Sequence, residues 1–222
     1  MGYFFKGNGF RLKTRIKICG LTRSEDILAA ADTGADAIGL VFYPQSSRFV
    51  ELEIAASLAS LVPPFVTIVG LFVNADPLTV RETLSIVPLH LLQFHGEEKE
   101  EYCRQFHLPY IKAARMKQGT DLLQYAAQFP SAQGILLDTF VDGYGGGGEV
   151  FDWASIPRAL PKPLILSGGL HSCNVGDAIA QVRPTAVDVS SGVEVAKGIK
   201  DAEKIRAFVS AVRAAEIKEK DD

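Results

Sequence analysis

Two residues at the ends of apolar segments stand where α/β proteins keep their chemistry. Cys19 closes the short segment 15–19, and Asp138 follows three large apolar residues at 135–137. A partly buried carboxyl group such as that of Asp138 can have its pKa raised and so donate a proton near neutral pH. Taken alone, Cys19 is typical of an inert buried thiol. Asp138 is either a helix cap or a functional acid, and the glycine-rich stretch that follows it disfavours the cap.

Two glycine-containing tetrapeptides predict a phosphate site. They are Ser167-Gly168-Gly169-Leu170 and Ser190-Ser191-Gly192-Val193. Glycine allows the close approach and the positive φ angles that a cradle of backbone N–H groups needs. The alternative is a pair of ordinary turns, but their occurrence after two predicted strands favours phosphate binding.

Two further polar residues and a glycine run stand in predicted loops. Arg48 follows the second strand and could clamp a carboxylate with its bidentate fork, although such an arginine is often only a solvated charge. His95 ends the fourth strand, and it lacks a second ligand at a metal-binding spacing, so we predict no metal site. The run 143–148 formally contains GxGxxG, but neither a following helix nor a P-loop lysine supports nucleotide binding. A flexible active-site loop is the favoured interpretation.

The elements that would position these residues alternate in a short, regular period. Predicted strands are 15–19, 37–42, 67–72, 89–94, 110–114, 134–138, 164–167 and 186–190. Predicted helices are 24–33, 51–61, 77–87, 97–106, 121–129, 174–181 and 201–217, with a weak one at 153–160 that Pro157 interrupts. Thr22 and Glu25 form a capping-box pattern before the first helix. This count predicts an α/β fold, a single (β/α)8 TIM barrel, with an open doubly wound sheet as the competing architecture.

In a barrel, the candidate site residues would all lie on the same face. The carboxyl ends of its strands meet on one face, where active sites of this fold lie. Residues 15–217 would form the barrel, 1–14 an N-terminal arm and 218–222 a charged tail. Strand parity gives Lys17 the same facing as Cys19, and Asp188 has the equivalent facing on strand eight. Because a buried lysine needs a partner, we expect Lys17 and Asp188 to form an ion pair.

Composition and charge limit the partners and the compartment. The chain has 222 residues and a net charge of -3, which argues against a nucleic-acid partner. Its three cysteines lack a CxxC pair, which favours a reducing, cytoplasmic setting over a disulfide framework or structural zinc. Neither a signal peptide nor a membrane-spanning run is apparent.

An ordered set of motifs is similar to the phosphoribosylanthranilate isomerase family. The motifs are Lys17-Ile18-Cys19-Gly20, 34–39 with Phe42 and Ser47-Arg48, 69–74, 92–96, 136–139, 151–153, 166–170 and 187–194. The resemblance implies an Amadori rearrangement of a phosphorylated small molecule, without metal or cofactor. It implies Cys19 as the general base, Asp138 as the general acid and Arg48 as the clamp for the anthranilate carboxylate. Residues expected to bind the phosphate are Gly168, Gly169, Ser190, Ser191 and Gly192, and His95 and Asp188 are also expected to contact substrate.

One loop departs from the family, and some alternatives stay open. The family usually has Gly-Gly-Ser/Thr-Gly-Lys before Phe-Asp-Trp, whereas this chain has glycine at 145–148 and then Glu149. The alternatives are another sugar-phosphate enzyme on the same fold, or a catalytically altered barrel that only binds phosphorylated metabolites. The resemblance is compatible with a monomer or a homodimer.

Overall fold

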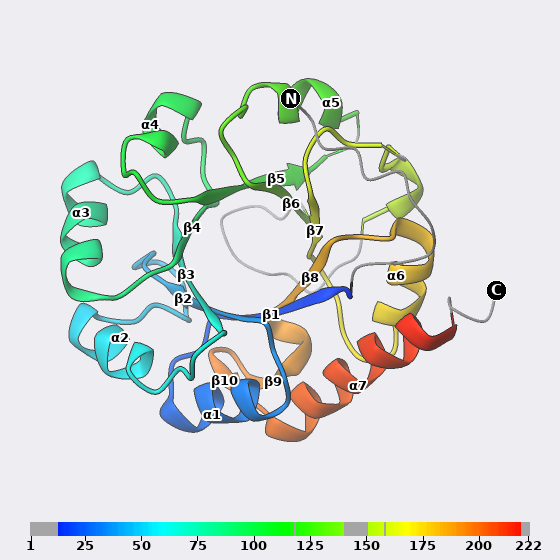
Figure 1. Ribbon diagram of the computed structural model, residues 1–222, viewed down its shortest axis with the longest axis horizontal. Coiled ribbons are helices and arrows are strands. Elements are labelled where there is room, and N and C mark those ends of the chain that lie inside the picture. The colour runs from blue at the N-terminus through cyan, green and yellow to red at the C-terminus, as the bar shows by residue number, and fades with distance from the viewer. Residues whose placement is uncertain (1–12, 118, 140–150, 158, 219–222) are drawn as a thin grey trace.

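Eight parallel strands close into a barrel in chain order (Figure 1). The computed structural model describes residues 13–117, 119–139, 151–157 and 159–218. The strands are β1 (Arg15–Cys19), β2 (Ala37–Val41), β3 (Thr67–Phe72), β4 (Leu91–Phe94), β5 (Tyr110–Met116), β6 (Gly134–Thr139), β7 (Leu164–Leu166) and β8 (Ala186–Val189). β1 pairs with both β2 and β8. That closure confirms the predicted barrel and excludes the open doubly wound sheet.

Helices surround the barrel on the outside (Figure 1). They are α1 (Ser24–Asp32), α2 (Leu52–Ala59), α3 (Pro77–Ile86), α4 (Glu100–Arg104), α5 (Leu122–Ala127), α6 (Val175–Val182) and α7 (Ala202–Lys218). Strand residues therefore face either these helices or the barrel interior, and most of them are buried. Ile16 and Ile18 on one face of β1 are fully buried, and Lys17 and Cys19 on the other face are nearly so. Every helix in the described residues is too short or too polar to cross a membrane.

The start of α1 differs from its prediction. Arg23, not Thr22, is the N-cap residue, and its side chain makes no capping hydrogen bond. The Thr22 hydroxyl instead donates to the carbonyl of Gly198, 2.7 Å away. The capping box was therefore wrong, because a long-range contact takes the hydroxyl that a local cap would use.

Two other predicted helices are shorter in the structure. The predicted helix 97–106 begins only at Glu100, because the buried Glu98 carboxylate accepts hydrogen bonds from the backbone N–H groups of Asn74 and Gly96 and holds a loop. The predicted segment 153–160 contains only a short 3-10 helix, η1 (Trp153–Ser155). Asp152 caps η1 through the N–H of Ala154, and the chain turns extended at Ile156, as expected before Pro157.

The sequence did not predict the elements between β8 and α7. A 3-10 helix, η2 (Ser191–Val193), leads into an antiparallel hairpin of β9 (Glu194–Ala196) and β10 (Ile199–Lys200). The hairpin lies beside α1 and α7 (Figure 1). This position brings charged residues of the hairpin next to the loop after β2.

The chain ends are only partly described. Residues 1–12 and 219–222 lie outside the described residues, so the arm and the tail stay predictions. At the boundary of the arm, the N–H of Thr14 donates to the Glu216 carboxylate at 2.6 Å. Lys218, predicted to begin the tail, is the last residue of α7.

Candidate active site

One pocket contains all but one of the predicted site residues. It lies where the carboxyl ends of the strands meet, as the barrel geometry requires. Its walls include Cys19, Arg48, His95, Asp138, Gly168, Gly169, Asp188, Ser190 and Ser191, together with Val41, Tyr43, Ser46, Leu71, Val73, Gln93, Ser167, Leu170 and Val189. Gly192 is absent from the lining. A Cβ at Gly192 would lie only 1.9 Å from the Leu170 carbonyl oxygen, so this glycine lets the two loops pack together.

A buried ion pair supports the floor of the pocket. Lys17 Nζ lies 2.9 Å from Asp188 Oδ1, and both side chains are 6% exposed. The two residues are direct neighbours in the register of β1 and β8. The predicted pair is confirmed, and it satisfies two charges that would each be costly to bury alone.

Cys19 sits next to this ion pair. Burial raises the pKa of the Cys19 thiol, and the charge and hydrogen bond of Lys17 oppose that effect. A Cβ at Gly39 would lie 2.8 Å from Cys19 Sγ and 3.1 Å from Lys17 Nζ, so glycine leaves the space where the two groups meet. The ammonium therefore favours the thiolate that a base requires, in a pocket that otherwise disfavours it.

Asp138 belongs to a short chain of polar contacts. Its Oδ2 lies 3.1 Å from His95 Nε2, and His95 Nδ1 lies 2.9 Å from Gln93 Nε2. Its Oδ1 accepts a hydrogen bond from the Thr139 N–H at 3.0 Å. Because the Gln93 amide nitrogen can only donate, His95 Nδ1 accepts that hydrogen bond, and the Nε2–H of His95 donates to Asp138 Oδ2. The contact thus holds the Asp138 carboxyl group in one orientation in the pocket.

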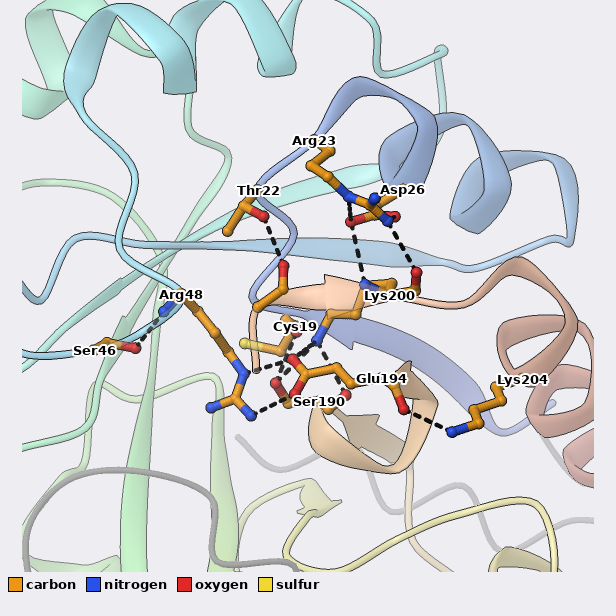
Figure 2. A network of polar contacts seen from close by, with 11 residues as sticks. Cys19, Thr22, Arg23, Asp26, Ser46, Arg48, Ser190, Glu194, Lys200 and Lys204 are labelled. Carbon is orange, nitrogen blue, oxygen red and sulfur yellow. Dashed lines mark hydrogen bonds and ion pairs between the residues drawn. The ribbon is translucent and has the colours of Figure 1, made fainter. Parts of the chain in front are cut away.

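Arg48 is not a solvated charge. Its Nε and Nη2 atoms donate to the Glu194 carboxylate at 2.7 and 2.8 Å (Figure 2). Arg48 is only 8% exposed, and it lines the same pocket as Cys19 and Asp138. The interpretation as a surface charge is therefore wrong, and the arginine is held in one orientation before any ligand arrives.

The two predicted phosphate loops face one rim of the pocket. Gly168 and Gly169 follow β7 with φ angles of 83° and 61°. After β8, the Ser190 hydroxyl donates to the Cys19 carbonyl at 2.9 Å. The glycine run 143–148 and Glu149 lie outside the described residues.

Sequence reasoning gave no role to three polar residues of this region. Gln93, Glu194 and Lys200 are all buried. The sequence does contain a signal for Gln93. It is a polar residue in an apolar strand, and it lies two residues before His95, so the two side chains share one facing. The fold of a hairpin brings Glu194 to Arg48 and Lys200 to Glu194, and no spacing in the sequence indicates these contacts.

Comparison with known proteins identifies the family. Residues 16–211 match the model of the family described as N-(5'phosphoribosyl)anthranilate (PRA) isomerase. The chain belongs to this family. The N-(5'-phosphoribosyl)anthranilate isomerase of Dechloromonas aromatica is 60% identical over 205 residues, which cover 92% of this chain and 99% of the relative. The Pseudomonas syringae pv. tomato protein of that name is 60% identical over 199 residues, covering 89% and 97%.

Solved structures of isomerase family members have the same fold. The phosphoribosylanthranilate isomerase of Thermotoga maritima superposes with a TM-score of 0.83 at 43% identity, covering 90% of this chain and 99% of that one. A phosphoribosylanthranilate isomerase in complex with reduced 1-(o-carboxyphenylamino)-1-deoxyribulose 5-phosphate superposes with a TM-score of 0.79 at 41% identity, with the same coverage. The predicted family and fold are therefore confirmed. The described residues contain no group of three or more His, Cys, Asp or Glu side chains that could hold a metal ion.

The environments of the three cysteines predict distinct reactivities. Cys173 is exposed, whereas Cys19 and Cys103 are buried. Burial raises the pKa of Cys103 to about 12 and that of Cys19 above its ordinary value. We expect iodoacetamide at pH 7 to label Cys173 first, and labelling of Cys19 to increase as the pH rises past the usual thiol pKa of about 8.5. Mass spectrometry of tryptic peptides measures this, and labelling of Cys19 at pH 7 as fast as Cys173 would contradict it.

Proposed function

We propose that this chain isomerises N-(5'-phosphoribosyl)anthranilate to 1-(o-carboxyphenylamino)-1-deoxyribulose 5-phosphate, an Amadori rearrangement in tryptophan biosynthesis. Family membership supports the activity. The observation that carries the assignment of roles is that a thiol from β1 and a carboxyl group from β6, Cys19 and Asp138, line one pocket. That pair supplies the base and the acid that the reaction needs.

Asp138 is the general acid in the first step. It donates its proton to the ring oxygen of the ribose as the bond between that oxygen and C1 breaks. The anthranilate nitrogen supplies its electron pair, and an open-chain iminium forms. His95, 3.1 Å from Asp138, donates a hydrogen bond from Nε2 that stabilises the carboxylate left by this step.

Cys19 is the general base in the second step. The iminium makes the C2 proton acidic, and the Cys19 thiolate removes it while the electron pair moves toward the nitrogen. The Cys19 thiol then returns its proton to C1 of the enaminol, and the Asp138 carboxylate takes the proton of the C2 hydroxyl, which leaves a ketone and restores both groups. Since the iminium of the substrate accepts the electrons, the residues present are sufficient for the chemistry. The positive iminium also favours a thiolate beside it, which offsets the burial of Cys19.

Arg48 and the two glycine loops are assigned to the anionic groups of the substrate. The Arg48 guanidinium pairs with the anthranilate carboxylate, which a bidentate fork recognises well. Backbone N–H groups near Gly168, Gly169 and Ser191 bind the phosphate, with Ser190 and Gly192 shaping the loop after β8. Asp188, next to the ribose, accepts a hydrogen bond from a sugar hydroxyl. A small-molecule phosphate ester is thus the proposed ligand.

A structure with inorganic phosphate tests the assignment of the phosphate loops. We expect the anion against the backbone of residues 168–169 and 191–192, because these loops share one rim of the barrel. Phosphate should also inhibit turnover competitively. An anion bound at the amino ends of the strands, or non-competitive inhibition, would contradict the assignment.

The unusual loop predicts a gain of affinity on mutation. Glu149 places a negative charge where the family usually has lysine, and glycines 145–148 raise the entropy lost when the loop orders. We therefore expect the double change Gly147→Ser and Glu149→Lys to lower KM while changing kcat little. Steady-state kinetics at low and high salt measure this effect. Salt screens the charge at residue 149, so the decrease in KM should be smaller at high salt. An unchanged KM at low ionic strength would mean that the loop stays away from the phosphate.

Two properties of the intact protein remain proposals. We place the protein in the cytoplasm, in keeping with the three unpaired thiols. We propose a monomer or a homodimer, in line with the solved monomeric forms of the dimeric Thermotoga maritima enzyme.

A further inference from the structure

Among the described residues, the Arg48 guanidinium is bound along one edge, and this geometry suggests how its direction is fixed. A guanidinium has a side-on edge, formed by Nε and Nη2, and an end-on edge, formed by Nη1 and Nη2. Glu194 takes the side-on edge with two hydrogen bonds of 2.7 and 2.8 Å. Nη1 takes no part in that pair and points away from Glu194 (Figure 2). The end-on edge therefore keeps two N–H groups in the parallel arrangement that a second carboxylate accepts.

We propose that Glu194 is a positioning residue for the reaction: it fixes the Arg48 fork so that its end-on edge receives the substrate's aromatic carboxylate. Lys200 lies beside the same carboxylate and helps to balance the negative charge of Glu194. This inference rests on the proposed function, since it takes Arg48 as the partner of that carboxylate. Glu194 is absent from the pocket lining, so it acts through Arg48 and not on the substrate.

The charges around Glu194 favour this arrangement. Its carboxylate lies 2.7 Å from Lys200 Nζ as well as from Arg48, and the Lys200 side chain is fully buried. Although burial works against ionisation, the bonds from Arg48 and the charge of Lys200 hold the pKa of Glu194 below its usual range. One anion between two cations leaves a single net positive charge on the cluster of Arg48, Glu194 and Lys200. A carboxylate on the ligand would neutralise that charge, which favours anionic over neutral ligands.

The backbone around Glu194 is tied to the scaffold at several points (Figure 2). On the β10 side of the hairpin, Arg23 Nη2 donates to the Lys200 carbonyl at 3.0 Å and to Asp26 at 2.6 Å. On the β9 side, Lys204 Nζ of α7 donates to the Glu194 carbonyl at 2.7 Å. The start of α1 and the first turn of α7 thus fix both strands of the hairpin. Glu194 therefore has a rigid base from which to orient a neighbouring side chain.

The stem of Arg48 is constrained as well. A Cβ at Gly20 would lie 2.4 Å from Arg48 Cδ, so the arginine passes directly over this glycine. Gly20 directly follows Cys19, so the direction of the guanidinium depends on where β1 ends. Held at its stem by Gly20 and at its head by Glu194, Arg48 has little rotational freedom to lose on binding.

Paired inhibitors test this inference. One is reduced 1-(o-carboxyphenylamino)-1-deoxyribulose 5-phosphate, and the other is its counterpart made from aniline, which lacks the carboxylate. We expect Glu194→Gln to weaken the first inhibitor about tenfold and leave the second unchanged, because one charged hydrogen bond is lost and the fork is freed. KM should rise by a similar factor with little change in kcat. Glu203→Gln is the matched control, because Glu203 is exposed and pairs with Arg206 outside the pocket.

Further variants separate the ways in which this inference could fail. With Arg48→Ala, adding Glu194→Gln should have no additional effect on either inhibitor. If Arg48→Ala leaves the preference for the carboxylate intact, the role of Arg48 in the proposed function is wrong. If Arg48→Ala removes that preference and Glu194→Gln does not, or if Glu194→Gln tightens the first inhibitor, only the role of Glu194 is wrong. Should Glu194→Gln not fold, Glu194→Asp keeps the charge but shortens the reach, and it is expected to weaken the first inhibitor selectively.

Discussion

Replacing Cys19 with alanine is expected to lower kcat by about 10²–10⁴-fold, the range typical for loss of a general base. The thiol is the group beside Lys17 and Asp188 that can take a proton from C2, and alanine cannot replace it. Cys19→Ser should lower kcat nearly as much, because a serine hydroxyl is far less acidic than a thiol. The fold should persist, since alanine or serine fits the space beside Gly39.

Steady-state assays that follow loss of substrate fluorescence measure this effect. Cys173→Ser is the matched control, because Cys173 is exposed and lies outside the pocket lining. It should retain the turnover of the unmodified protein. Near-normal turnover of Cys19→Ala, with circular dichroism showing a folded protein, would remove Cys19 from the mechanism.

Asp138→Asn is the second change with a large expected effect, again about 10²–10⁴-fold in kcat. Asparagine has the same shape, and its amide oxygen can still accept the hydrogen bond from Thr139. It cannot donate an acidic proton to the ring oxygen, so ring opening should become slow. KM should change little, because the anionic ends of the substrate are bound by other groups.

Asp177→Asn on the exposed surface of α6 is the matched control for this change. Turnover measured across a pH series distinguishes loss of an acid from loss of shape. If Asp138→Asn retained more than about a tenth of the activity, the general-acid assignment could not stand.

Periodicity and parity predicted the parts of this molecule that depend on regular geometry. The alternation of short apolar segments predicted the barrel, and the two-residue period of a strand predicted that Lys17 and Asp188 would meet. The meeting of all strand carboxyl ends on one face of a barrel placed Cys19 and Asp138 together. In each case the prediction concerned residues within strands, where backbone geometry fixes the direction of a side chain.

Loops and long-range polar contacts limited what the sequence could predict. Thr22 looked like a cap, but it donates to Gly198 in a hairpin that no local pattern indicates. The predicted helix at 97–106 began late because Glu98 folds into the loop and pairs with Lys112 at 3.2 Å. Arg48 was correctly placed near the pocket, yet its partner Glu194 is far along the chain. Such pairs depend on how loops fold, and the spacing of residues does not contain that information.

The central claim is that Asp138 opens the ring and Cys19 then removes the C2 proton. Cyanoborohydride reduces an open-chain iminium but not the closed ring, so it reports on the first step alone. We expect Cys19→Ala to form the reduced, ribityl product from the substrate faster than the enzyme-free background, because ring opening proceeds and the next step is blocked. Asp138→Asn should give only the background rate. Equal trapping by the two variants, or faster trapping by Asp138→Asn, would contradict the division of roles between these two residues.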